Sequence, residues 1–179
     1  MRVFTLPNVI TLIRIIIIPI FVTALIYKRY HYALILFIIC AVSDMLDGLL
    51  ARITNQKTQL GALLDPIADK LLLITSFILF SLYGWIPKWL TVTVISRDMI
   101  VTLGWILLYL IHNMTHVKPT FTGKTAIASQ LLLIAYTLLS ITVMGIPPSK
   151  NWMAWTVATL TIISGLHYIY RGLTQANEK

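Results

Sequence analysis

The stretch Asp44-Met-Leu-Asp47-Gly48-Leu-Leu-Ala51-Arg52, followed by Gly61, Asp65 and Asp69, dominates this sequence. It holds four of the six acidic residues of the chain, and long apolar segments flank it on both sides. An ionised carboxylate in apolar surroundings is costly unless it has a partner or a function. No comparable set of cations lies nearby, so the four carboxylates predict bound metal ions.

The composition around this stretch is that of a membrane protein. Of the 179 residues 58% are hydrophobic, whereas soluble domains contain roughly 45–50%. We therefore expect one integral-membrane domain over residues 1–179. The net charge is +8, but only 11% of the residues are charged. Cytoplasmic flanks and anionic lipid or phosphate substrates explain such a charge better than nucleic acid does.

The hydropathy pattern predicts an all-α, polytopic bundle of six transmembrane helices. A spanning helix needs about 20 mostly apolar residues, and breaks such as Gly84 with Pro87 separate the candidates. A transmembrane β-barrel would show alternating apolar and polar residues instead of long apolar runs. The six segments are 8–27, 32–52, 60–82, 88–112, 121–144 and 151–170.

The Lys and Arg residues predict the orientation of this bundle. An even number of spans puts both termini on one face of the membrane. That face carries more cations than the other, so we expect the termini and the aspartate motif to be cytoplasmic, with the chain in the inner membrane of the cell. The termini face carries Arg2, Arg52, Lys57, Lys118, Arg171 and Lys179, and the opposite face Lys28, Arg29, Lys88 and Lys150.

Helical spacing gathers the motif on two faces. Asp44, Asp47, Gly48 and Ala51 follow an i, i+3, i+4, i+7 pattern, and Gly61, Asp65 and Asp69 follow i, i+4, i+8. The short connection between the two segments predicts antiparallel neighbours whose faces meet. Hard oxygen ligands in that number suit a pair of Mg²⁺ or Mn²⁺ ions. The small residues leave room for a ligand against the backbone, and Arg52 offers a fork for a phosphate.

Other interpretations of the motif explain less of it. Small residues alone often serve helix packing, but packing would not retain four aspartates. A small cation transporter or channel would account for acids inside a membrane. It would not account for their clustering near one interface beside Arg52, and the outer halves of the segments carry almost no polar groups to continue a pathway. A non-catalytic scaffold gives no reason to keep every motif position.

The string Asp-x2-Asp-Gly-x2-Ala-Arg-x8-Gly-x3-Asp-x3-Asp resembles the signature of the CDP-alcohol phosphotransferase family at every fixed position. The resemblance implies a six-helix membrane protein, a homodimer, that uses a CDP-linked donor and two divalent cations. It implies metal ligation by Asp44, Asp47, Asp65 and Asp69. It implies donor binding by Asp44, Gly48, Ala51, Arg52, Gly61 and Asp65, and a general-base role for Asp69.

Further stretches resemble the phosphatidylglycerol-phosphate synthase and cardiolipin synthase branches of that family. These are Leu6-Pro7-Asn8-x2-Thr11-x2-Arg14 and Ser164-Gly165-x2-Tyr168-x-Tyr170-Arg171-Gly172. Two other stretches resemble the eukaryotic-type cardiolipin synthases more than the phosphatidylglycerol-phosphate synthases. These are Ser96-Arg97-Asp98 and Lys118-Pro119-Thr120-Phe121, the second of which leads to Lys124 and Gln130. Glycerophosphate-using members typically carry a second lysine where this chain has Ala126. The resemblance therefore favours phosphatidylglycerol as acceptor and CDP-diacylglycerol as donor, with glycerol 3-phosphate as the alternative acceptor.

Either acceptor is anionic, and four cations are candidates to hold it: Arg97, Lys118, Lys124 and Arg171. Lys118 and Arg171 could equally be interfacial residues that snorkel. Lys124 is the strongest candidate because it lies just inside the fifth segment on the cytoplasmic side. Arg97 and Asp98 are adjacent, and adjacent helical residues point apart, so we expect separate partners for them.

Overall fold

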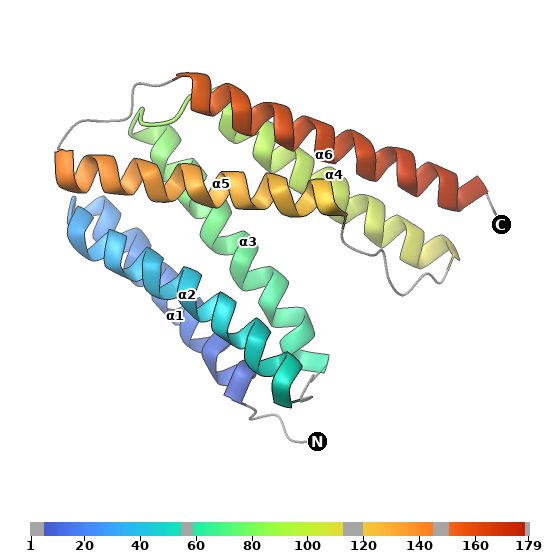
Figure 1. The fold of residues 1–179 in the computed structure, drawn as a ribbon, viewed down its shortest axis with the longest axis horizontal. Coiled ribbons are helices and arrows are strands. Elements are labelled where there is room, and N and C mark those ends of the chain that lie inside the picture. The colour runs from blue at the N-terminus through green and yellow to red at the C-terminus, as the bar shows by residue number, and fades with distance from the viewer. Residues whose placement is uncertain (1–5, 55–58, 113–119, 145–150, 178–179) are drawn as a thin grey trace. The chain divides into compact units, whose positions relative to one another are not determined.

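The computed structural model of this chain describes residues 6–54, 59–112, 120–144 and 151–177. Within these ranges the chain forms six α-helices and one π-helical turn, with no strand (Figure 1). The side chains at positions 6–10, 44–54, 59–67, 69, 105–112, 144, 173 and 175–177 lie outside the description. The helices are α1 (Leu6–Ile26), α2 (Tyr30–Thr54), α3 (Gln59–Leu82), α4 (Lys88–His112), α5 (Phe121–Leu139) with the π-helical turn Ser140–Met144, and α6 (Asn151–Asn177).

All six predicted segments are helical, which confirms the all-α prediction. Their ends agree with the apolar runs to within a few residues, except that α6 continues to Asn177 rather than ending near residue 170. Its last turns contain Arg171 and Thr174, and the Thr174 Oγ1 donates a hydrogen bond to the Tyr170 carbonyl oxygen at 2.9 Å. The hydropathy pattern ended where the residues became polar, whereas a helix needs only its backbone hydrogen bonds to continue.

Two helices are each followed, two residues after their end, by a residue in the left-handed backbone conformation. Gly84 follows α3 with φ of 73°, and the Trp85 N–H donates to the Phe80 carbonyl oxygen at 2.9 Å. Lys28 follows α1 with φ of 57°, and the Arg29 N–H donates to the Ala24 carbonyl oxygen at 2.8 Å. Both bonds close the helix end in the pattern typical of a left-handed cap, which confirms the predicted breaks at these positions.

The chain divides into two compact units. The first comprises Met1–Leu79 and Ala135–Pro147, and the second comprises Phe80–Ile134 and Pro148–Lys179. In the first unit α1 packs along α2, with the Phe21 and Phe37 ring centroids 6.3 Å apart. The π-helical turn after α5 contacts α2, where the Thr142 Oγ1 donates to the Tyr30 carbonyl oxygen at 3.4 Å. This unit carries the whole aspartate motif.

In the second unit α4 packs along α6 (Figure 1). Leu90 and Val94 of α4 and Val157 and Ala158 of α6 are buried. Near the beginning of both helices the Trp89 and Trp155 rings contact each other in a tilted arrangement, with centroids 4.6 Å apart. The first half of α5 belongs to the same unit. Three consecutive helices, α4, the first half of α5 and α6, therefore build most of this unit.

Large apolar side chains are exposed on both units. Ile16 of α1 is 64% exposed, and Leu132 of α5 is 70% exposed. Among the described residues, one helical stretch, Phe121–Val143, is long and apolar enough by itself to cross a membrane. Thr11–Ile26, Tyr30–Ser43 and Lys70–Leu82 are apolar but shorter. The helices are thus shown, and the prediction that all six span a membrane stays a prediction, as does that of one domain over residues 1–179.

Candidate functional site

The aspartate motif lies on two consecutive helices of the first unit. α2 carries Asp44 and Asp47 in its last three turns, and α3 carries Asp65 and Asp69 in its first three. Four residues, 55–58, join the two helices, so the end of α2 and the start of α3 lie near each other (Figure 1). The helical backbone thus keeps the i, i+3 and i, i+4 spacings that put each pair on one face.

The side chains of the motif lie outside the described residues. This applies to Asp44, Asp47, Gly48, Ala51, Arg52, Gly61, Asp65 and Asp69. Elsewhere, where side chains are described, no group of three or more His, Cys, Asp or Glu residues could hold a metal ion. Four carboxylates on two linked helices suit a pair of hard divalent cations by the chemistry of their oxygens. The meeting of the four carboxylates remains a prediction.

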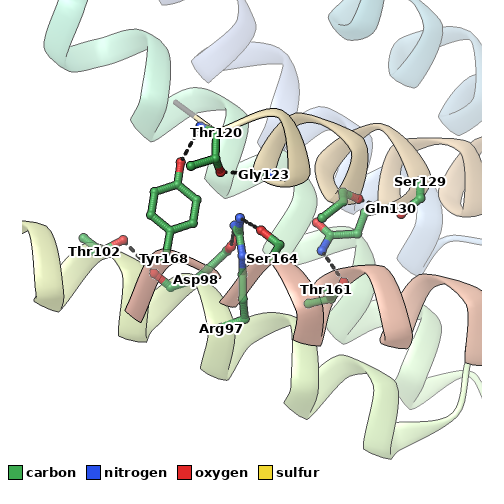
Figure 2. A network of polar contacts seen from close by, with 11 residues as sticks. Arg97, Asp98, Thr102, Thr120, Gly123, Ser129, Gln130, Thr161, Ser164 and Tyr168 are labelled. Carbon is green, nitrogen blue, oxygen red and sulfur yellow. Dashed lines mark hydrogen bonds and ion pairs between the residues drawn. The ribbon is translucent and has the colours of Figure 1, made fainter. Parts of the chain in front are cut away.

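A second polar cluster lies among α4, α5 and α6 of the second unit (Figure 2). Its side chains come from three of the sequence stretches that resemble the cardiolipin synthase branch. Arg97 and Asp98 belong to α4, Thr120 precedes α5, and Tyr168 belongs to α6. The fold thus brings together residues up to 71 positions apart, and no pattern in the sequence predicts their contacts.

Arg97 is the centre of this cluster, and it is only 7% exposed. Its Nη1 lies 2.6 Å from the Asp98 Oδ1, and its Nη2 donates to the Ser164 Oγ at 2.7 Å. The guanidinium carbon lies 5.6 Å from the centroid of the Tyr168 ring, within cation–π range. Figure 2 shows the side chain reaching from α4 towards α6.

The expectation of separate partners for Arg97 and Asp98 is therefore wrong. Adjacent helical side chains leave the backbone in different directions, but the long arginine side chain folds back far enough to reach its neighbour. Both side chains are only 8% exposed. A buried charge left without a partner costs more free energy than the loss of side-chain freedom in the pair.

Tyr168 ties the start of α5 to α6. The Thr120 N–H donates to the Tyr168 hydroxyl at 3.4 Å, and the Gly123 N–H donates to the Thr120 Oγ1 at 3.2 Å. A neighbouring hydrogen bond between the Thr122 hydroxyl of α5 and the His167 Nδ1 of α6, 3.0 Å long, also joins the two helices. A Cβ at Gly123 would lie 3.0 Å from the Tyr168 Cε2, so the ring occupies the space that a side chain would need. No role for Tyr168 follows from the sequence stretch Ser164–Gly172 that contains it.

Replacing Gly123 by alanine tests this close approach. We expect Gly123→Ala to lower stability by about 1–3 kcal/mol, because the added methyl group meets Tyr168 and Thr120 at 3.0 and 3.1 Å. Gly104→Ala is the matched control in α4, where a Cβ meets nothing within 4 Å. There we expect no loss, since alanine is the better helix former. The measurement is the midpoint of thermal unfolding in detergent, and equal midpoints for both variants would contradict the predicted contact.

The polar cluster continues one turn along α6. The Gln130 Nε2 donates to the Thr161 Oγ1 at 3.0 Å, and Thr161 lies three residues before Ser164 on the same helix face. The Gln130 Oε1 and the Arg97 Nε are buried and have no hydrogen-bond partner in the described part of the chain. Buried polar groups that lack partners are rare, which makes this cluster a candidate for ligand contact.

Two other acceptor candidates are sequence neighbours of cluster residues. Lys124 is exposed, directly follows Gly123 in α5, and donates its N–H to the Thr120 carbonyl oxygen at 3.2 Å. Arg171 is half-buried and lies three residues after Tyr168 on α6. Lys118 lies outside the described residues. Of the four predicted cations, Arg97 therefore contacts Tyr168, whereas the described side chains of Lys124 and Arg171, near it in the sequence of α5 and α6, make no contact with its ring.

Comparison with known proteins gives consistent matches. The family model described as CDP-alcohol phosphatidyltransferase matches residues 4–163. A Mycobacterium bovis protein named "Putative cardiolipin synthase" is 36% identical over 126 residues, which are 70% of this chain and 60% of that protein. The chain thus spans less than two thirds of the length of this relative.

Two longer alignments cover most of both proteins. A Mycobacterium tuberculosis protein named "Probable phosphatidylglycerophosphate synthase" is 32% identical over 178 residues, which are 96% of this chain and 83% of that protein. A Bacillus subtilis protein named CDP-diacylglycerol–glycerol-3-phosphate 3-phosphatidyltransferase is 32% identical over 186 residues, which are 92% of this chain and 93% of that protein.

Proposed function

The chain belongs to the CDP-alcohol phosphatidyltransferase family, and on that basis we propose that it transfers the phosphatidyl group of CDP-diacylglycerol to a glycerol-phosphate-type acceptor in phospholipid biosynthesis. The observation that carries the proposal is the complete aspartate motif, present at every fixed position on two linked helices. An acceptor hydroxyl oxygen forms a bond to the phosphorus that bears diacylglycerol. The bond from that phosphorus to CMP breaks, and CMP leaves.

The aspartates divide the work of this reaction. Asp44, Asp47, Asp65 and Asp69 hold two divalent cations, Mg²⁺ or Mn²⁺, which when bound neutralise the diphosphate charge. Asp69 also takes the proton of the acceptor hydroxyl as general base. Asp44 and Asp65 contact the CDP part of the donor as well.

The remaining motif residues bind and orient the donor. Arg52 provides a planar fork for a phosphate. Gly48, Ala51 and Gly61 leave the backbone open, so that the CDP part can lie directly against both helices. Together these residues fix the reacting phosphorus beside Asp69.

The proposed setting is the inner membrane, with six spanning helices, cytoplasmic termini and active site, and a homodimeric assembly. The exposed apolar side chains on both units support the membrane location, because such surfaces are unfavourable in water. Acyl chains of the donor then remain in the bilayer while its cytidine enters the cytoplasmic side.

Phosphatidylglycerol is the favoured acceptor, and cardiolipin the product. The Asp98 carboxylate takes up the charge of Arg97, which leaves Lys124 and Arg171 as the available cations among the described candidates. A phosphodiester carries one negative charge and needs fewer cations than a phosphate monoester. Glycerol 3-phosphate is the alternative, supported by the names of the Mycobacterium tuberculosis and Bacillus subtilis relatives.

Product analysis with labelled CDP-diacylglycerol tests the acceptor. We expect label in cardiolipin when phosphatidylglycerol is supplied, and a higher acceptor KM for Lys124→Ala at similar donor KM. Lys88→Ala is the matched control, because Lys88 is also an exposed lysine in the first turn of its helix. The opposite result is label only in phosphatidylglycerol-phosphate, with glycerol 3-phosphate as the sole working acceptor. This result would contradict the choice of phosphatidylglycerol as acceptor but would still agree with the proposed transfer reaction.

A further inference from the structure

The side of α1 that is buried in the first unit has an apolar part and a polar part. Its buried side chains follow one another at alternating spacings of three and four residues, the pattern of a helix that packs along a neighbour. They are Thr11, Arg14, Ile18, Phe21 and Leu25, and none is more than 4% exposed. The last three are apolar and the first two are polar. An arginine that is 1% exposed is costly unless a partner takes up its charge.

The matching side of α2 leads to the aspartate motif. Ala33, Phe37 and Cys40 are buried at spacings of four and three residues. The same alternation along this helix continues to positions 44 and 47, which are Asp44 and Asp47. These two are the only acidic residues in the sequence of α1 and α2, and Asp44 is the first acidic residue of the chain. Within the two helices, a carboxylate for Arg14 can therefore come only from these positions.

The contact between the Phe21 and Phe37 rings shows which residues of the two helices are level with each other. Only residues 27–29 separate α1 from α2, and the two helices lie side by side as an antiparallel pair (Figure 1). Arg14 lies seven residues before Phe21. Asp44 lies seven residues after Phe37. Both steps are about 10 Å in the same direction along the pair, so Arg14 and Asp44 are level.

The burial of other residues agrees with this register. Leu25 and Ala33 each lie four residues from the ring contact, towards the connection between the helices, and both are fully buried. Ile18 and Cys40 each lie three residues from it in the other direction, and they are 4% and 1% exposed. The two helices therefore keep one register over all the layers whose side chains are described.

The polar part of α1 thus lies at the level of the first two aspartates. By the same count Thr11, which is fully buried, is level with Asp47. Arg14 also interacts electrostatically with Cys40, which precedes Asp44 by about one helical turn. The charge of Arg14 therefore lies near the part of α2 at which the motif begins.

We propose that Arg14 forms a buried ion pair with Asp44 and so holds this carboxylate in the position that metal and donor binding require. The inference rests on the proposed function and deepens it, because Asp44 is assigned there to both ligands. A carboxylate has two oxygens, so one can accept from the guanidinium while the other remains available to a cation. Arg14 acts through Asp44 and is therefore a positioning residue.

A double-mutant cycle in excess chelator tests the pair without metal and without turnover. The measured quantity is the change in unfolding midpoint that Asp44→Asn causes, once in wild type and once in Arg14→Met. We expect the two changes to differ by about 5 °C or more. Asp44→Asn is less favourable in wild type, because there it leaves the buried charge of Arg14 unbalanced. Equal changes in the two backgrounds would overturn the inference.

Lys28→Met is the matched control for the removal of a cation. Lys28 is exposed and lies beyond the other end of α1, about 20 Å from Arg14 along the helix axis. Asp44→Asn should change the midpoint of Lys28→Met by the same amount as that of wild type. A difference as large as the one expected for Arg14→Met would show a general effect of net charge and would overturn the inference.

A rescue experiment decides the matter if Arg14→Met does not fold. Arg14→Met/Asp44→Leu replaces both members of the pair by apolar side chains, and such replacement of a buried ion pair is often neutral or stabilising. We expect the double variant to recover the folded protein. A double variant that remains unfolded would contradict the pair.

Turnover gives a second readout, which separates positioning from a purely structural role. Arg14→Met should lower kcat/KM for CDP-diacylglycerol about 10–100-fold, and Arg14→Lys, which keeps the charge, should lose less. In an Asp44→Asn background, Arg14→Met should cause little further loss, because the carboxylate that it positions is already absent. The same factor in both backgrounds would contradict the inference. Absence of CMP release from wild type with every acceptor would instead contradict the proposed function, and the stability cycle would still decide whether the pair forms.

Discussion

Asp69→Asn is expected to lose about 10²–10⁴-fold in turnover while it still binds CDP-diacylglycerol. Asparagine keeps the shape of the side chain, but its amide cannot accept the proton of the acceptor hydroxyl. The measurement is the initial rate of CMP release at saturating donor and acceptor, together with donor binding by the purified protein.

Asp44→Asn provides the comparison within the same motif. Asp44 is assigned to metal and donor binding, without a role in proton transfer, so we expect this variant to weaken the binding of both. Turnover of Asp69→Asn near the wild-type rate would show that another group is the base. Equal losses of donor binding in the two variants would contradict the division of roles between Asp44 and Asp69.

Removal of divalent cations is expected to abolish transfer, and Mg²⁺ or Mn²⁺ should restore it. In the proposed arrangement the four carboxylates face one another, and their mutual repulsion favours the binding of cations between them. The measurement is CMP release after chelation and after titration with each metal. Full turnover in excess chelator would contradict the two-metal proposal.

A stability measurement gives a second readout that does not depend on turnover. A ligand that binds the folded state raises the unfolding midpoint according to its concentration and affinity. Mn²⁺ should therefore raise the midpoint of wild type and have little effect on Asp65→Asn. An equal rise in both proteins would place the bound cation outside the motif.

The sequence predicts the helices better than their contacts. Long apolar runs and the breaks at Gly84 and Lys28 give six helices with nearly correct ends, because helix formation depends mainly on local residues. The extension of α6 to Asn177 escaped prediction because hydropathy reports apolar content, and polar residues also form helices. The contacts that join Arg97, Ser164 and Tyr168 depend on how α4 and α6 pack, which spacing along one segment does not contain.

In the candidate site, too, the helices that carry the residues were predictable from the sequence, whereas the contacts between side chains were not. The placement of the aspartate motif on two consecutive helices follows from the sequence pattern, because its residues lie within 26 positions in two neighbouring apolar segments. The meeting of its four carboxylates stays a prediction. The pairing of Arg97 with Asp98 was predicted wrongly, because directions along an ideal helix ignore both the reach of an arginine side chain and the cost of leaving a buried charge unpaired. Burial decides that contact, and burial follows from the tertiary structure.

The most direct test of the central claim is CMP release by the purified protein from CDP-diacylglycerol in lipid–detergent micelles, measured with and without a glycerol-phosphate-type acceptor. The proposal predicts that CMP forms only when acceptor and a divalent cation are both present, and that one phospholipid product forms for each CMP. Absence of CMP with phosphatidylglycerol and with glycerol 3-phosphate, in a folded protein supplied with Mg²⁺ or Mn²⁺, would contradict it.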